Sequence, residues 1–243
     1  IYSSVNPNTF QPYVDGKTIP TQPSAVGAKV PAIFGSSMFS SHSFHTHPPA
    51  LWNCNSDHVV ADTYPDAKEG NLFVLGQFGT TNITAGQYAS FLQVNFGSSA
   101  PLVAQRYNLS TFPAFSAIAT IITVVSYKCP AYRALRLSTN QNHIPAYTYF
   151  WNHTPQCSWQ PSIPQRIVAL VGATHTSEIP FVMGNLHGLP GQGPNCSFNP
   201  QESSISESLI AAWSGMAVGG DPNLLANGQG ELPWPAWNEN TSL

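Results

Sequence analysis

Two short apolar runs with the character of buried strands constrain the fold of this chain more than any other feature. Val30–Gly35 is a short run closed by glycine, and Ile144–Trp151 alternates aromatic with smaller residues. Apolar positions recur at helical spacing in residues 85–96, 102–109 and 112–137. Strands separated by helical segments predict a mostly parallel sheet flanked by helices, which is the α/β class. In such sheets, functional residues collect in loops at the carboxyl ends of the strands.

Helix boundaries are indicated by proline and glycine. The pattern over Phe112–Leu137 predicts one or two helices interrupted at Pro130, because a proline ring cannot continue the hydrogen-bond ladder. A last helix is expected over Ser204–Val218, stopping at Gly219. Residues 1–23 are rich in Pro, Asn, Ser and Thr and predict an extended loop. No internal repeat and no boundary between domains is visible in the sequence.

Charged residues are scarce, which limits the partners that the chain can have. Only 8% of residues are Asp, Glu, Lys or Arg, and the net charge is −3. Without a basic run there is no electrostatic footprint for nucleic acid or for an anionic membrane surface. The apolar stretch Phe112–Val125 is shorter than the ~20 residues of a membrane span and predicts a buried helix.

Glycosylation sequons and cysteines indicate the secretory pathway. Five Asn-x-Ser/Thr sequons are present, at Asn82, Asn108, Asn152, Asn195 and Asn240. Together with four cysteines and few charges, they predict a secreted or extracellular chain with paired cysteines. The first residue is Ile and no apolar leader follows it, so we expect that a leader was removed or that the chain continues a longer polypeptide.

A histidine and a glutamate are the strongest candidates for chemistry. His175 lies in a Gly-bearing loop shortly before the apolar run Ile179–Val182. A loop histidine needs an orienting carboxylate to act as a base at neutral pH. Glu69 is the candidate, because it follows the first predicted strand once the intervening segment is set aside. We expect both residues in strand-end loops, and Glu178 as a buried, hydrogen-bonding carboxylate.

Several motifs around these residues resemble one family. They are Val30-Pro31-x-Ile33-x-Gly35-Ser36, Glu69-Gly70-x-x-Phe73, Gly172-x-x-His175-x-x-Glu178-Ile179-Pro180-Phe181-Val182-x-Gly184, Gly220-Asp221-Pro222-Asn223 and Trp234-Pro235-x-Trp237. In this order they resemble the type-B carboxylesterases, which include fungal lipases and cholinesterases. The likeness covers the whole chain except residues 38–65.

The resemblance implies a Ser-Glu-His triad on an α/β-hydrolase fold, with Glu69 as the acid and His175 as the general base. It implies no metal or organic cofactor. The Gly-x-Ser-x-Gly elbow of the nucleophile is absent from the 243 residues, and so is the Gly-rich segment that would supply an oxyanion hole. The chain therefore resembles the C-terminal portion of a family member, with the N-terminal half missing. Without a serine and oxyanion donors, we expect the chain alone to be inactive and prone to aggregate.

Residues 38–65 depart from the family pattern, which leads from the first strand to Glu69 within a few residues. The segment carries His-x-x-His-x-His at His42, His45 and His47, a spacing that suits a metal site. It is also compatible with a neutral surface insertion. We interpret it as a retained intron, because its ends can be encoded as splice signals and its removal restores the family's Gly-Ser-Asn before Glu69.

Three cysteine pairings are possible from spacing alone. If residues 38–65 are spurious, Cys54 is lost and three cysteines remain. Cys129 and Cys157 flank the second predicted strand, and we expect them to form the disulfide. Cys196 is then free or bridged to the missing half.

The sequence favours a secreted carboxylic ester hydrolase that acts on an ester or lipid substrate through an acyl-enzyme. The alternative is a non-catalytic adhesion or binding member of the same fold, in which triad positions drift. Retention of both Glu69 and His175 argues against that alternative. A natural two-chain product, or an inactive fragment, is a third interpretation.

Overall fold

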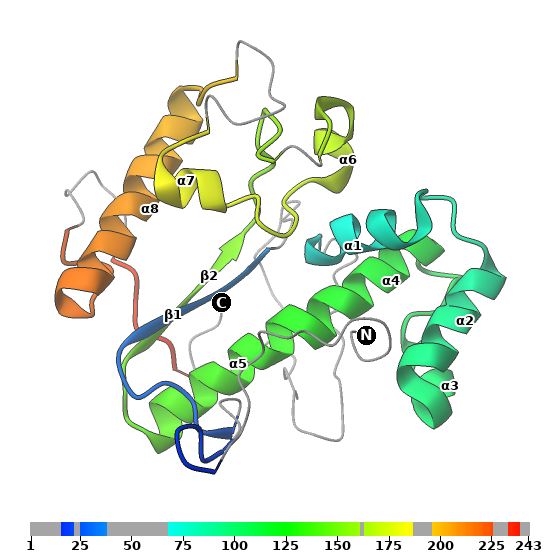
Figure 1. Cartoon of the computed structure of the whole chain (residues 1–243), viewed down its shortest axis with the longest axis horizontal. Coiled ribbons are helices and arrows are strands. Elements are labelled where there is room, and N and C mark those ends of the chain that lie inside the picture. The colour runs from blue at the N-terminus through cyan, green and yellow to red at the C-terminus, as the bar shows by residue number, and fades with distance from the viewer. Residues whose placement is uncertain are drawn as a thin grey trace.

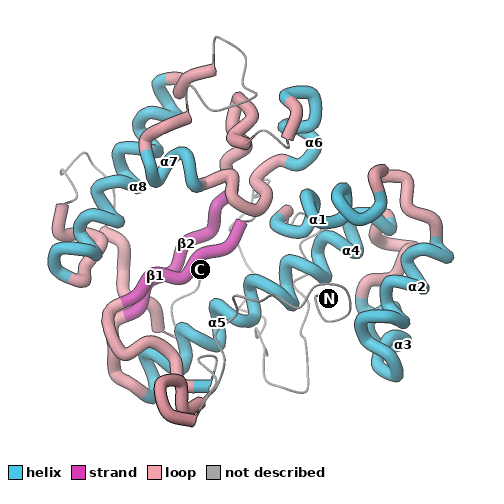
Figure 2. The backbone as a smooth tube through the Cα atoms, in the orientation of Figure 1, coloured by secondary structure: helices cyan, strands magenta, loops and turns pink. Residues whose placement is uncertain are grey.

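A computed structural model describes most of the chain. The described residues are 16–21, 25–37, 68–160, 163–186, 196–225 and 233–238. Three features of the sequence lie outside the described residues: residues 38–65, the sequons at Asn195 and Asn240, and most of the predicted opening loop. Figures 1 and 2 show a central strand pair between two groups of helices.

The two predicted strands are confirmed, and they pair in parallel. β1 (Ala32–Ser37) lies beside β2 (Ala146–Trp151), with Ala32 opposite Ala146. β1 begins two residues later than the apolar run, because Pro31 has no amide hydrogen to donate to a neighbouring strand. A parallel pair brings the carboxyl ends of both strands to one edge.

A long, continuous helical rod runs beside the strands (Figure 1). It consists of α4 (Ala114–Thr123), the π-helical turn η3 (Val124–Lys128), α5 (Cys129–Arg136) and a second π-helical turn, η4 (Leu137–Gln141). The expected interruption at Pro130 is wrong. The amide of Cys129 bonds to the carbonyl of Val124, so the helix widens into a π-turn just before the proline instead of ending.

The same rod is long and apolar enough to cross a membrane by length and composition, over Ala114–Gln141. The apolar stretch alone suggested a shorter helix. In the most apolar part of this rod, 61% is buried inside the protein, and Ala117–Thr123 lie in the core. The contacts are those of a core helix packed by its neighbours.

A helical layer covers α4. α1 (Glu69–Phe78) packs along α4, while α2 (Ala85–Phe96), the 3-10 turn η2 (Gly97–Ser99) and α3 (Ala100–Arg106) close that side. The helix predicted over residues 85–96 is confirmed, and Thr84 caps it with a capping box to Gln87. The expectation that Glu69 lies in a strand-end loop is wrong, because Glu69 is the first residue of α1.

The opposite side is covered by the C-terminal helices. η5 (Gln165–Ile167) and α6 (Val168–Val171) lead to the His175 turn, followed by α7 (Ile179–Met183) and α8 (Pro200–Gly219). The last predicted helix is confirmed, with one more turn at its start. Asn199 caps that turn and Glu202 completes the capping box.

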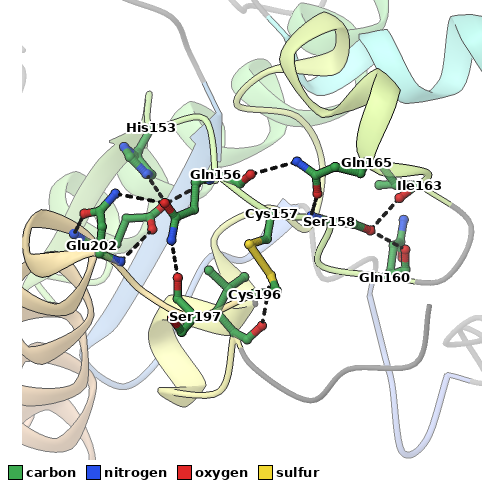
Figure 3. Close-up of a disulfide and its surroundings, with 12 residues drawn as sticks. His153, Gln156, Cys157, Ser158, Gln160, Ile163, Gln165, Cys196, Ser197 and Glu202 are labelled. Atoms are coloured by element: carbon green, nitrogen blue, oxygen red, sulfur yellow. Dashed lines mark hydrogen bonds and ion pairs between the residues drawn. A yellow bond between two sulfur atoms is a disulfide. The ribbon is translucent and has the colours of Figure 1, made fainter. Parts of the chain in front are cut away.

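One disulfide joins the segment after β2 to the start of α8 (Figure 3). It links Cys157 to Cys196, whose Cα atoms lie 5.8 Å apart. The predicted pairing of Cys129 with Cys157 is therefore wrong; Cys129 is itself disulfide-bonded, with another partner. The reason is spatial, because β2 directs the following chain toward α8, where Gln156 also donates to the carbonyl of Ser197.

Candidate active site

The structure brings the predicted acid and base together. Nδ1 of His175 lies 3.1 Å from Oε2 of Glu69. The Glu69 side chain is 7% exposed and that of His175 is 40% exposed. Glu69 comes from the first residue of α1, and His175 comes from the turn before α7. No hydrogen bond to the second ring nitrogen, Nε2, is made within the described residues.

The position of Glu69 is fixed through its backbone. The amide of Gly70 donates to Oγ1 of Thr123 in α4, and Oγ1 of Thr174 donates to the carbonyl of Glu69. A Cβ atom on Gly70 would lie 2.2 Å from the carbonyl oxygen of Ala119. Residue 70 must therefore be a glycine for α1 to approach α4, and this approach places the carboxylate.

The turn that carries His175 is shaped by unusual backbone angles. Gly172 has φ of 65°, and Thr176 has φ of 72°, which is uncommon for a β-branched residue. Two buried indoles brace the turn, since Trp159 donates to Oγ1 of Thr176 and Trp151 donates to Oγ of Ser177. These contacts hold the strained turn next to α1.

The local charges favour a protonated imidazole. The hydrogen bond that Nδ1 of His175 donates to Glu69 raises the pKa of His175, and the negative charges of Glu69 and Glu178 raise it further, against the lowering effect of burial. A carboxylate on Nδ1 fixes the tautomer in which Nε2 accepts a proton. The pair can therefore take a proton at Nε2 and stabilise the resulting imidazolium.

Glu178 is partly buried, and its charge acts on both members of the pair. Burial raises the pKa of Glu178, and so does the charge of Glu69. Its own backbone amide bonds to the carboxylate, but Oε2 is buried without a hydrogen-bond partner among the described residues. The expectation of a hydrogen-bonding carboxylate is thus met by only one of its two oxygens.

Two aromatic rings contact the imidazole. The ring centroid of Phe73 lies 5.3 Å from that of His175, and the centroid of Tyr127 lies 5.0 Å from it. Phe73 belongs to a motif noted in the sequence, whereas sequence reasoning missed Tyr127. The proline at position 130 is the only signal of an irregular helix there, and it does not reveal which side chain faces the histidine.

Three predicted glycosylation sites are exposed. Asn82, Asn108 and Asn152 lie in loops or at element ends with solvent-exposed side chains. Over the described part of the chain, no group of three or more His, Cys, Asp or Glu side chains is placed to hold a metal ion. A shallow groove of about 410 Å³ between α1 and α2 is lined by residues such as Gln77 and Asn95 and does not include the Glu69–His175 pair.

An acid after one strand and a histidine after the neighbouring parallel strand are an arrangement of α/β-hydrolases. The profile of the Carboxylesterase family matches residues 2–243, and the chain belongs to this family. The family has the α/β-hydrolase fold, with which the helix-rich structure and its small parallel sheet are compatible.

Curated relatives include three bile salt-activated lipases. The human lipase is 26% identical over 219 residues, covering 88% of this chain and 26% of the lipase. The mouse and rat lipases are 24% and 25% identical, covering 92% of this chain and 34% and 33% of their own lengths. The chain thus spans between a quarter and about a third of the length of these relatives.

Proposed function

We propose that this chain supplies the general base and the acid of a secreted carboxylic ester hydrolase. The observation that carries the proposal is the hydrogen bond of 3.1 Å between Nδ1 of His175 and Oε2 of Glu69, which joins the start of α1 to the turn before α7. Membership of the Carboxylesterase family supports ester hydrolysis as the reaction class. The substrate is a carboxylic ester or a lipid ester.

In the proposed reaction, a serine hydroxyl attacks the ester carbonyl while Nε2 of His175 takes its proton. The imidazolium then protonates the departing alcohol, leaving an acyl-enzyme. Water attacks the acyl-enzyme by the same proton transfers and releases the acid. Glu69 holds the imidazole at Nδ1 throughout and stabilises the imidazolium by its charge.

The serine comes from a segment that precedes this chain in a longer polypeptide. The 243 residues contain no Gly-x-Ser-x-Gly elbow, and the partly exposed imidazole of His175 leaves a side open to such a segment. We call this longer polypeptide the complete protein. The proposal describes the chain as the C-terminal part of an α/β-hydrolase domain, inactive alone.

Secretion is supported by the disulfide between Cys157 and Cys196 and by the exposed sequons at Asn82, Asn108 and Asn152. Disulfides persist in oxidising compartments, and Asn-linked glycans are added only in the secretory pathway. We propose that these three asparagines are glycosylated, together with Asn195 and Asn240.

The proposal is tested by hydrolysis of p-nitrophenyl esters. We expect the complete protein to be active and this chain alone to be inactive. His175→Ala should reduce kcat of the complete protein by at least about a thousandfold. His143→Ala is the matched control, because His143 is exposed and has no contact with Glu69. Activity of the chain alone, or undiminished activity of His175→Ala, would contradict the proposal.

A further inference from the structure

Two aromatic rings pack against the imidazole of the candidate base. The Phe73 and Tyr127 rings are tilted by 44° and 47° to the imidazole of His175, and their centroids lie 6.0 Å from each other. They come from α1 and η3, whereas His175 comes from the turn before α7. The imidazole therefore contacts both α1, which also carries Glu69, and the η3 turn of the long helical rod.

The π-helical turn determines where Tyr127 points. A π-turn holds one more residue than an α-turn, so it shifts the phase of the residues on either side by about 100°. Val124 and Cys129, at its two ends, both stay buried in the core. The extra residue lets both halves of the rod keep their buried faces while Tyr127, between them, reaches His175.

We propose that Tyr127 is a positioning residue for His175. Its ring and that of Phe73 block rotation of the imidazole, which keeps Nδ1 on Glu69 and directs Nε2 away from the core. The negative face of an aromatic ring also favours a cation, which stabilises the imidazolium. This inference rests on the proposed function, because it assigns Tyr127 a role in the proton transfers of His175.

Other groups near the imidazole do not replace this contact. The charged groups that act on His175 are Glu69 from α1 and Glu178 from its own turn. Both favour the imidazolium, but only Glu69 bonds to the ring. One hydrogen bond fixes a ring nitrogen and leaves the tilt of the ring free, whereas packing on the ring faces restricts the tilt.

The test compares three variants of the complete protein. Tyr127→Leu removes the ring, and Tyr127→Phe keeps the ring but removes the hydroxyl. Tyr132→Leu is the matched control, because Tyr132 lies in the same rod but packs edge-on against Trp237, with centroids 5.6 Å apart. The rate of His175 modification by diethylpyrocarbonate, followed by peptide mass spectrometry against pH, reports both the pKa and the exposure of the imidazole.

We expect Tyr127→Leu to lower the pKa of His175 toward its usual value and to speed its modification several-fold, because the ring leaves Glu69 more often. Modification of the exposed His143 should not change. Tyr127→Phe and Tyr132→Leu should each retain the wild-type pKa of His175. For ester hydrolysis, kcat of Tyr127→Leu should fall about tenfold or more, with KM unchanged.

A folded Tyr127→Leu protein with the wild-type pKa and modification rate at His175 would overturn the inference. So would a Tyr127→Phe protein that behaves like Tyr127→Leu, because the ring would then not be the cause. Neither readout requires ester hydrolysis. If the complete protein does not hydrolyse esters, the pKa and the modification rate of His175 can still be measured. Failure of the proposed function can therefore be distinguished from failure of the role of Tyr127.

Discussion

Glu69 and His175 lie 106 positions apart in the chain, yet Oε2 of one and Nδ1 of the other are 3.1 Å apart. Each is held by contacts that do not involve the other. Glu69 is fixed by the approach of α1 to α4, and the His175 turn is braced by the indole of Trp159. The fold of this chain thus holds the two side chains in contact by itself.

The pair makes stability depend on pH. The pKa of His175 is raised in the folded protein, chiefly by its bond to Glu69. Its contribution to the free energy of unfolding is therefore complete below the unfolded value near ~6.5 and is lost as pH rises through the folded pKa. The stability difference between the wild type and Glu69→Gln should be larger at about pH 5.5 than at about pH 9. Urea unfolding of the complete protein at both pH values measures it, and an equal difference at both would contradict the prediction.

Gly70→Ala should destabilise the protein and displace Glu69. The new Cβ would meet the carbonyl oxygen of Ala119 at 2.2 Å, so α1 must move away from α4, at a cost of about 1–3 kcal/mol. Gly76→Ala is the matched control in the same helix, because nothing lies within 4 Å of its new Cβ. It should stabilise by about 0.5–1 kcal/mol. Thermal unfolding measures the stability of both variants, and equal changes in stability for Gly70→Ala and Gly76→Ala would contradict the prediction.

Glu202→Ala should destabilise the start of α8. Its fully buried carboxylate accepts from the amides of Gln156 and Asn199 and lies 2.9 Å from Nε2 of His153 (Figure 3). Removing it leaves these donors without their acceptor, at a cost of about 3 kcal/mol. Glu207→Ala, on the exposed side of the same helix, should change stability by less than about 0.5 kcal/mol. Urea unfolding measures the free energy of unfolding of both variants, and similar losses in the two would contradict the prediction.

Replacing both Cys157 and Cys196 by serine should cost about 3–4 kcal/mol, because the bridged residues are 39 positions apart in sequence. Peptide mapping without reduction should recover a linked peptide that joins Cys157 to Cys196. A peptide linking Cys129 to Cys157 would contradict the structure.

The sequence predicted what depends on local pattern. Both strands follow from short β-prone apolar runs, and the helix at residues 85–96 follows from periodicity. The last helix was predicted over residues 204–218 from its glycine stop, and its first turn, over residues 200–203, was missed. The acid and the base follow from family motifs, while their contact depends on the tertiary fold. The start of α1 was missed because its anchors, Thr123 and Ala119, belong to another helix.

Other features could not be read from local pattern either. The π-turn that contains Tyr127 keeps the rod buried at both of its ends, and which faces are buried is decided by packing. The disulfide partner of Cys157 is set by the direction in which the chain leaves β2. Spacing along the sequence contains neither kind of information.

In the proposed function, Glu69 and His175 act as one unit in ester hydrolysis. The most direct measurement is kcat/KM of the complete protein for a p-nitrophenyl ester, in the wild type, Glu69→Ala, His175→Ala and the double variant. If the carboxylate works only through the imidazole, the double variant should be no slower than His175→Ala alone. Losses that multiply in the double variant, or a Glu69→Ala protein as fast as the wild type, would contradict the account.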